Sequence, residues 1–195
     1  MVFRSYELKK NLLRKEVSRE TKQAYLDGVR ELEAQWWVIK AIVCDGKRGM
    51  LWGFWKIATQ MCIFHQHQII RRYITKRPRL EANIELKEIL ECIGNFRKRN
   101  VELLLADWYR RYKTFLWEKN DSNNLIHTRT RKAYKSMKTN LKYLYTFKDY
   151  KWEIEIPRTT NSLESIFGHM KQKLWLHRWL KKWRKLKLID VFLWK

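Results

Sequence analysis

The sequence predicts an α/β protein in which a core of mixed sheet and flanking helices is interrupted by a large helical segment. Two observations predict this class. An amphipathic stretch at 18–35 runs directly into the apolar, β-branched run 37–44, and from about residue 79 onward the apolar residues recur only at helical spacing. We therefore divide the 195 residues into a first part of the core, 1–75, a helical insertion, 76–150, and a C-terminal helical part of the core, 151–195.

The first part of the core begins with short apolar clusters at 1–3 and 12–13, which predict one or two strands. A helix follows, because apolar residues recur at i, i+4 and i+7, and Ser18 or Thr21 is available as its N-cap. These apolar residues are Tyr25, Val29 and Leu32.

The run from Trp37 to Cys44 is almost entirely apolar, as expected for a strand covered on both faces in a parallel sheet. After Asp45 we expect a basic turn, then a helix at 51–60 and another strand at 61–70.

Two later regions have clear helical periods. Within the insertion, apolar residues form two successive helical stripes, which include Leu86, Ile89, Leu90 and Ile93 and then Val101, Leu105 and Trp108. In the C-terminal part, the spacing i, i+3, i+4, i+7, i+11 predicts a helix that continues, with a bend, into the basic end of the chain; its apolar residues are Leu163, Ile166, Phe167, Met170 and Leu174.

The charge of the chain indicates an anionic partner. Lys and Arg number 43 against 20 Asp and Glu, which gives a formal charge of +23 and a pI near 10.1. Nucleic acid and acidic membrane surfaces are the usual partners of such a protein. No apolar run is long enough to span a bilayer, no leader segment is recognisable, and the three cysteines form no paired framework. We therefore expect a reduced, cytoplasmic protein.

Basic residues concentrate in two segments that also contain aromatic residues. Segment 129–151 has eight Lys and Arg with Asp149 as its only acidic residue, and segment 165–195 has nine with Asp190 alone. This composition favours a groove for the phosphate backbone of DNA, while an amphipathic helix lying on an anionic membrane is the alternative. The candidate DNA-binding residues are Lys171, Lys173, Arg178, Lys181, Lys182, Arg184 and Lys185.

Two carboxylates are candidates for a metal site, and each has a structural alternative. Asp45 follows a predicted parallel strand, at the edge where α/β proteins bind ligands, but Asp-Gly is also a common turn. Glu164 lies in the first turn of the predicted C-terminal helix, where it could face a site or simply cap backbone N–H groups.

Cys62 and His65 form a C-x-x-H pair without a second ligand pair at zinc-finger spacing. In the strand expected at 61–70 their side chains would point to opposite faces, so a buried structural role is favoured for Cys62.

Three stretches together resemble bacterial insertion-sequence transposases of the Mutator-like, DDE, ribonuclease-H-like class. They are WVIKAIVCDGKRGM at 37–50, TQMCIFHQHQIIRRYITKRPRLEANIELKEI at 59–89 and TTNSLESIFGHMKQKLWLHRWLKK at 159–182. The resemblance implies an incomplete ribonuclease-H-like core. It also implies that Asp45 and Glu164 are catalytic carboxylates that hold two Mg²⁺ ions, with Cys62 and His65 as a C-x-x-H feature between them.

The resemblance also implies differences from an intact transposase. Its first catalytic Asp would lie on a strand before the segment MVFRS, so we expect an N-terminally truncated and catalytically impaired chain. Expected partners are transposon ends and target DNA in the nucleoid, and also a second copy of the chain or an intact transposase. The alternative is a DNA-binding protein without chemistry, or an inhibitor of an intact transposase.

Two tryptophans, Trp36 and Trp179, stand where the resemblance leads us to expect glycine. Glycine is scarce, at 6 residues, while tryptophan is abundant, at 11. One hypothesis is that the source of this protein reads some of these codons as glycine.

Overall fold

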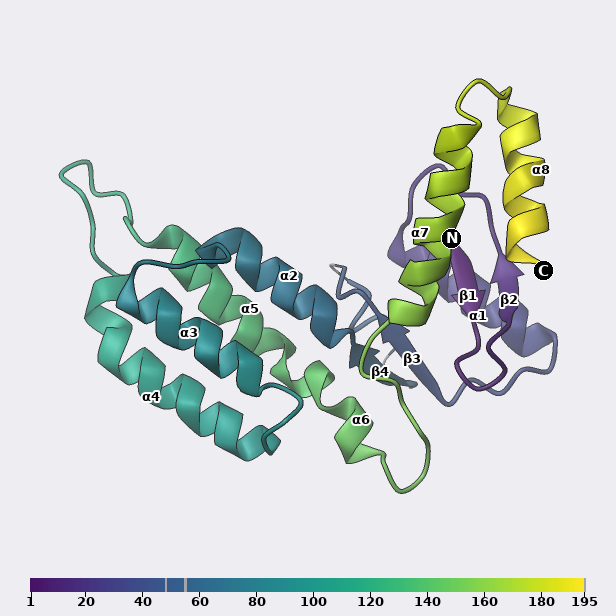
Figure 1. Ribbon diagram of the computed structural model, residues 1–195. Coiled ribbons are helices and arrows are strands. Elements are labelled where there is room, and N and C mark those ends of the chain that lie inside the picture. The colour runs from purple at the N-terminus through teal and green to yellow at the C-terminus, as the bar shows by residue number, and fades with distance from the viewer. Residues whose placement is uncertain (48, 55, 195) are drawn as a thin grey trace. The chain divides into compact units, whose positions relative to one another are not determined.

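The computed structural model describes residues 1–47, 49–54 and 56–194 and divides into two compact units (Figure 1). We call residues 1–39 and 160–195 the terminal unit, and residues 40–159 the central unit. Helices and two small sheets make up the described chain, so the predicted α/β class is confirmed at this coarse level. Each sheet has two strands, and the ribonuclease-H-like core stays a prediction.

The terminal unit begins with an antiparallel hairpin of β1 (Val2–Arg4) and β2 (Asn11–Arg14), followed by α1 (Lys22–Ala34). Thr21 is the N-cap of α1, since its Oγ1 accepts a hydrogen bond of 3.1 Å from the backbone N–H of Ala24. The predicted strands, helix and cap are therefore confirmed.

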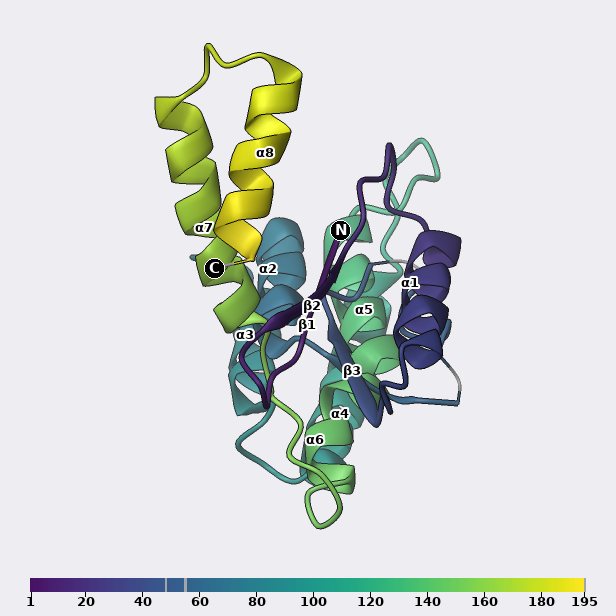
Figure 2. The same ribbon diagram turned by 90° about the vertical axis from the view of Figure 1, so that its right-hand side faces the viewer.

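The same unit ends in a helical hairpin of α7 (Asn161–Leu176) and α8 (Lys182–Leu193), joined by residues 177–181 (Figure 2). The predicted helix is confirmed, and its expected bend is a complete break. Asn11 Nδ2 donates a hydrogen bond of 2.6 Å to the carbonyl of Leu193, and Arg14 forms an ion pair with Asp190. Both contacts join β2 to α8, so the two ends of the chain build one unit.

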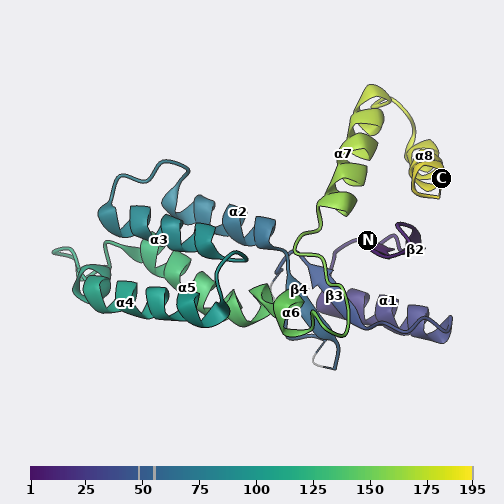
Figure 3. The ribbon, with the colours of Figure 1, turned by 60° about the horizontal axis from the view of Figure 1, so that its bottom comes forward.

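The central unit contains the parallel pair of β3 (Ala41–Cys44) and β4 (Ala58–Met61), with Cys44 opposite Met61. Helices α2 (Ile63–Ile74), α3 (Glu81–Cys92), α4 (Lys98–Leu116) and α5 (Thr128–Leu144) lie alongside one another, and the short α6 (Thr146–Asp149) follows (Figure 3). Trp108 is fully buried among them and donates its indole N–H to the carbonyl of Ala82 at 2.9 Å.

Three element predictions in the central unit need correction. The helix predicted at 51–60 is wrong, because 58–61 is strand β4, while Trp55 lies outside the described residues. The strand predicted at 61–70 is also wrong, because Ile63–Ile74 is helix α2. The strand predicted from Trp37 is shorter: β3 begins at Ala41, and it is largely half-buried rather than covered on both faces.

Among the described residues, no helix combines the length and the apolar character that crossing a bilayer would require.

Candidate metal-binding and DNA-binding residues

Asp45 directly follows β3, at the carboxyl end of the parallel pair, as the sequence predicted. The backbone N–H of Lys47 donates a hydrogen bond of 3.0 Å to Oδ1 of Asp45, whose side chain is exposed. Gly46 has a φ of +77°, and a Cβ on it would lie only 2.3 Å from Met61 Cε. Both features support the interpretation of Asp45-Gly46 as a turn.

The turn does not consume the binding capacity of the carboxylate. A carboxylate can accept about four hydrogen bonds or metal contacts, so the bond from Lys47 leaves acceptor capacity on Asp45. Its place at the carboxyl end of a parallel strand is where α/β proteins commonly bind ligands. Metal binding by Asp45 therefore stays a prediction beside the observed turn.

Glu164 lies in the first turn of α7 and is half-buried. The hydroxyl of Thr160, the N-cap residue, donates a hydrogen bond of 2.7 Å to Oε1 of Glu164. A carboxylate at a helix N-terminus is also stabilised by the helix dipole. Asp45 belongs to the central unit and Glu164 to the terminal unit, so neither unit by itself contains both carboxylates.

Cys62 and His65 lie on one face of a helix, which corrects the expectation of opposite faces of a strand. Cys62 is the N-cap of α2 and His65 is in its first turn, so their spacing of three residues places them side by side. The Cys62 sulfur and a ring nitrogen of His65 lie within 4.8 Å of each other. Cys62 is fully buried, and its backbone N–H donates a hydrogen bond of 2.8 Å to the carbonyl of Cys44.

Burial shifts the pKa values of Cys44 and His67, two groups near Cys62 and His65. Desolvation raises the pKa of the Cys44 thiol to about 11, so Cys44 is a protonated thiol at neutral pH. Desolvation, assisted by Arg71, lowers the pKa of His67, so His67 is predominantly neutral at pH 7. These shifts favour structural roles for Cys44 and His67 over nucleophilic or cationic ones.

The candidate DNA-binding residues lie on the hairpin of α7 and α8. Lys171 and Lys173 are on α7, Arg178 and Lys181 are in the connection, and Lys182, Arg184 and Lys185 are on α8. We call these seven residues the terminal basic surface. Six are exposed and Lys185 is half-buried. The exposed Trp175, Trp179 and Trp183 are interleaved with them, and the exposed Trp194 follows α8.

Acidic residues neutralise little of the terminal basic surface. Asp190 on α8 is paired with Arg14 instead. Lys182 Nζ lies 3.9 Å from Glu16 Oε1, but both side chains are mostly exposed, so this pair contributes little. Among the described residues, the other six cations of the surface form no ion pair. Lys187 is a further cation beside the terminal basic surface that was not among the predicted DNA-binding residues, and its Nζ lies 5.2 Å from the centre of the Trp183 ring.

A second row of cations follows the exposed face of α5, opposite its buried residues. The spacing of three and four residues makes each cation a neighbour of the next along the helix surface. We call this row the α5 basic stripe, and it consists of the exposed residues Arg129, Lys132, Lys135, Lys138 and Lys142. The basic segment 129–151 was evident from composition, and the spacing of its cations also predicts the stripe.

Comparison with known proteins gives no match to a family model, a curated protein or a solved structure.

Proposed function

We propose that this chain is part of the catalytic region of a transposase and binds the phosphate backbone of DNA. The observation that carries the proposal is the terminal basic surface, where seven Lys and Arg side chains are interleaved with three exposed tryptophans. Lys and Arg neutralise phosphates, and aromatic rings stack on exposed bases. The resemblance of three stretches to Mutator-like transposases supports the choice of class.

The proposal assigns Asp45 and Glu164 as ligands of Mg²⁺. The residues fit the ion, because carboxylate oxygens are its preferred protein ligands and both side chains are at least partly open to solvent. Bound Mg²⁺ ions would activate a water or a DNA 3′-hydroxyl and stabilise the leaving oxygen in phosphodiester displacement. The cations hold the DNA, and the carboxylates do not contribute to that attraction, so the two activities are separable.

Fluorescence anisotropy with labelled duplex DNA at increasing NaCl concentration tests the DNA-binding part. We expect affinity to fall steeply with salt and to depend little on DNA sequence. Replacing Lys181, Lys182, Arg184 and Lys185 together by Gln should reduce the affinity and flatten the log–log salt slope by about 0.9 for each phosphate contact that is lost.

A matched control changes four exposed cations outside the terminal basic surface to Gln, namely Lys10, Arg19, Arg99 and Lys113. A control variant that loses as much affinity would show that only net charge matters. A flat salt dependence, or tighter binding to phosphatidylserine vesicles than to DNA, would contradict the proposal.

A second candidate is a DNA-binding protein without chemistry, which the observed Asp45 turn favours. Asp45→Asn separates the candidates, because the Asn side-chain oxygen can still accept the N–H of Lys47 and keep the turn. If Asp45 is a ligand, calorimetric titration with Mg²⁺ should detect weak binding to the original chain and none to the variant, with unchanged thermal stability. Equal Mg²⁺ binding by both would remove Asp45 from the metal site.

With two carboxylates alone, we expect no Mg²⁺-dependent strand cleavage.

A further inference from the structure

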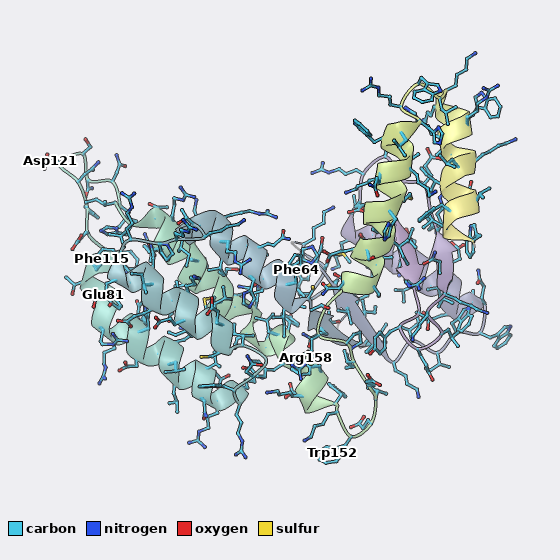
Figure 4. The ribbon with its side chains drawn as sticks, viewed as in Figure 1. Phe64, Glu81, Phe115, Asp121, Trp152 and Arg158 are labelled. Atoms are coloured by element: carbon cyan, nitrogen blue, oxygen red, sulfur yellow. The ribbon has the colours of Figure 1, made fainter. Side chains whose placement is uncertain are left out.

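The central unit contains a cavity where α2 ends and where α3 and α5 begin. Its volume is about 380 Å³, and it is lined by residues 73–75, 77–80, 83, 126, 127, 129 and 130. In Figure 4 this end of the helices is marked by Glu81, in the first turn of α3, and by Phe115, which stacks on the ring of His127.

Positive charge dominates the cavity wall. Arg77 and Arg79 come from the connection between α2 and α3, and Arg129 comes from the first turn of α5. Arg129 is held in place, because its Nη2 donates a hydrogen bond of 2.5 Å to the carbonyl of Arg72 at the end of α2. None of the described lining residues is Asp or Glu. Two carboxylates lie beside lining residues: Glu118 Oε2 is 2.9 Å from His127 Nε2, and Glu81 follows Leu80 in the first turn of α3.

A buried amide in the wall has a hydrogen-bond donor to offer. Asn83 is 9% exposed, and its Oδ1 accepts a hydrogen bond of 2.8 Å from the hydroxyl of the buried Thr130. This bond fixes the orientation of the amide. Within residues 1–47, 49–54 and 56–194, the Nδ2 group of Asn83 has no hydrogen-bond partner. This donor is reachable from solvent at the cavity wall, where an acceptor atom of a bound ligand can accept its hydrogen bond.

Two helix N-termini add to the field in the cavity. Leu80 precedes α3 and His127 precedes α5, and neither makes a side-chain capping hydrogen bond. The free N–H groups and the positive end of each helix dipole favour an anion. Arginine forks, an amide donor and two helix N-termini together match the several acceptor oxygens of a phosphate group.

We propose that this cavity binds the phosphate group of a nucleotide. A volume of about 380 Å³ exceeds what inorganic phosphate needs and falls within the usual range of about 300–1,000 Å³ for small-molecule sites. Tyr73, Leu80 and Ile126 provide aromatic and apolar wall beside the arginines, against which a sugar or base can pack. The nucleotide is either a free mononucleotide or a residue within a nucleic-acid strand.

Isothermal titration calorimetry of the full chain with three small probes tests the site. The probes are AMP, inorganic phosphate, and a dithymidine with one internal phosphodiester and no terminal phosphate. AMP should bind, and inorganic phosphate should compete with it. Arg79→Gln and Arg129→Gln should each weaken AMP binding about tenfold, because each removes a charge-assisted hydrogen bond to phosphate.

Arg99→Gln is the matched control, since Arg99 is an exposed arginine on α4 that does not line the cavity. It should leave AMP binding unchanged, and the thermal melts of Arg99→Gln and Arg79→Gln should coincide with that of the original chain. Arg129→Gln also removes the hydrogen bond to the Arg72 carbonyl, so a small decrease in its melting temperature is expected. Dithymidine binding that is lost in the same variants would identify a phosphodiester within a strand as the ligand. AMP binding alone would identify a terminal phosphate.

The proposal is overturned if none of the probes binds at millimolar concentration, or if Arg99→Gln weakens AMP binding as much as Arg129→Gln does. Failure of the nucleotide-binding proposal can be told apart from failure of the proposed DNA-binding function, because different residues carry the two activities. The Gln variant of the terminal basic surface should lose duplex affinity while it retains AMP binding, because none of its four substituted residues lines the cavity.

Discussion

Trp36 occupies a backbone position that favours glycine. It follows the C-cap of α1 with a φ of +68°. Its N–H donates to the carbonyl of Glu33 at 3.0 Å, and the N–H of Trp37 donates to the carbonyl of Leu32 at 3.1 Å. This pair of bonds defines a Schellman motif, in which the left-handed residue is usually glycine. The Trp36 side chain is 93% exposed, so little packing offsets the backbone strain.

We expect Trp36→Gly to raise the free energy of unfolding by about 1 kcal/mol, the usual magnitude for a side chain in the left-handed region. Urea unfolding followed by circular dichroism measures it. Trp152→Gly is the control, because Trp152 is 87% exposed but does not have a positive φ (Figure 4). Equal stabilisation by both substitutions, or none by Trp36→Gly, would contradict the backbone argument.

The same position bears on the excess of tryptophan. If the source reads some of these codons as glycine, peptide mass spectrometry of the native protein should find Gly at position 36. Tryptophan found at both 36 and 179 would remove that hypothesis. Of positions 36 and 179, position 36 gives the more decisive test of the codon hypothesis, because Trp36 has a positive φ that favours glycine and Trp179 does not.

At the scale of the elements, α3 and α4 are joined by a polar cluster at the surface of the central unit. Arg111 on α4 donates two hydrogen bonds to the carboxylate of Glu85 on α3, at 2.8 and 2.6 Å, and the Tyr112 hydroxyl donates a third at 2.7 Å. The bonds from Arg111 and then Tyr112 lower the pKa of Glu85 below its ordinary value near 4.5.

This lowered pKa predicts a pH-dependent contribution to stability. The contribution is present above the unfolded-state pKa of Glu85 and is lost as the pH falls through the lower folded-state value. We expect Glu85→Gln to reduce stability at pH 7 and to unfold like the original chain near pH 2. Urea unfolding at a series of pH values measures the difference. A difference that stays constant down to pH 2 would mean that the Glu85 charge contributes nothing.

The elements that the sequence predicted well carry their own local signals. Helices α1 and α7 have regular apolar spacing, and Thr21 supplies a cap at the start of α1. The strand ending before Asp45 was also predictable, because it is apolar and β-branched. In each case the residues that fix the element lie within one short stretch of chain.

Residues 58–74 were mispredicted because distant contacts bury their polar side chains. On α2, Gln66, Ile70 and Ile74 are buried at helical spacing. Because the first of these, Gln66, is polar, the apolar residues alone do not show the helical period. The Gln66 Oε1 accepts a hydrogen bond of 2.9 Å from Asn140 on α5. On β4, the buried Gln60 accepts a hydrogen bond of 3.0 Å from the N–H of Phe147. Partners more than seventy residues away are not visible in a local sequence pattern.

The candidate site was predictable only in part for a similar reason. The sequence located Asp45 and the basic C-terminal segment, since strand ends and charge runs are local features. The cavity at the start of α3 and α5 has no such pattern, because Arg79 and Arg129 are separated by two helices in the chain.

At the scale of the whole molecule, the two units should respond separately to mutation. Leu193, near the C-terminus, is 5% exposed and belongs to the terminal unit. Leu193→Ala should destabilise that unit by about 2–5 kcal/mol, as for other buried leucines. Hydrogen exchange should then accelerate at amides of 1–39 and 160–194 while those of 40–159 keep their protection. A uniform acceleration would show that the units unfold together.

The terminal unit cannot be completed early in synthesis, because its two segments are separated in the sequence by the whole central unit. A ribosome delivers residues 1–39 first, but Asn11 and Arg14 must wait for Leu193 and Asp190 before their contacts can form. The central unit, an unbroken stretch of 120 residues from 40 to 159, can fold while translation continues. During that interval the hairpin of β1 and β2 lacks its contacts with α8. Translational pausing within 160–193 would therefore prolong the period in which a chaperone can bind this hairpin.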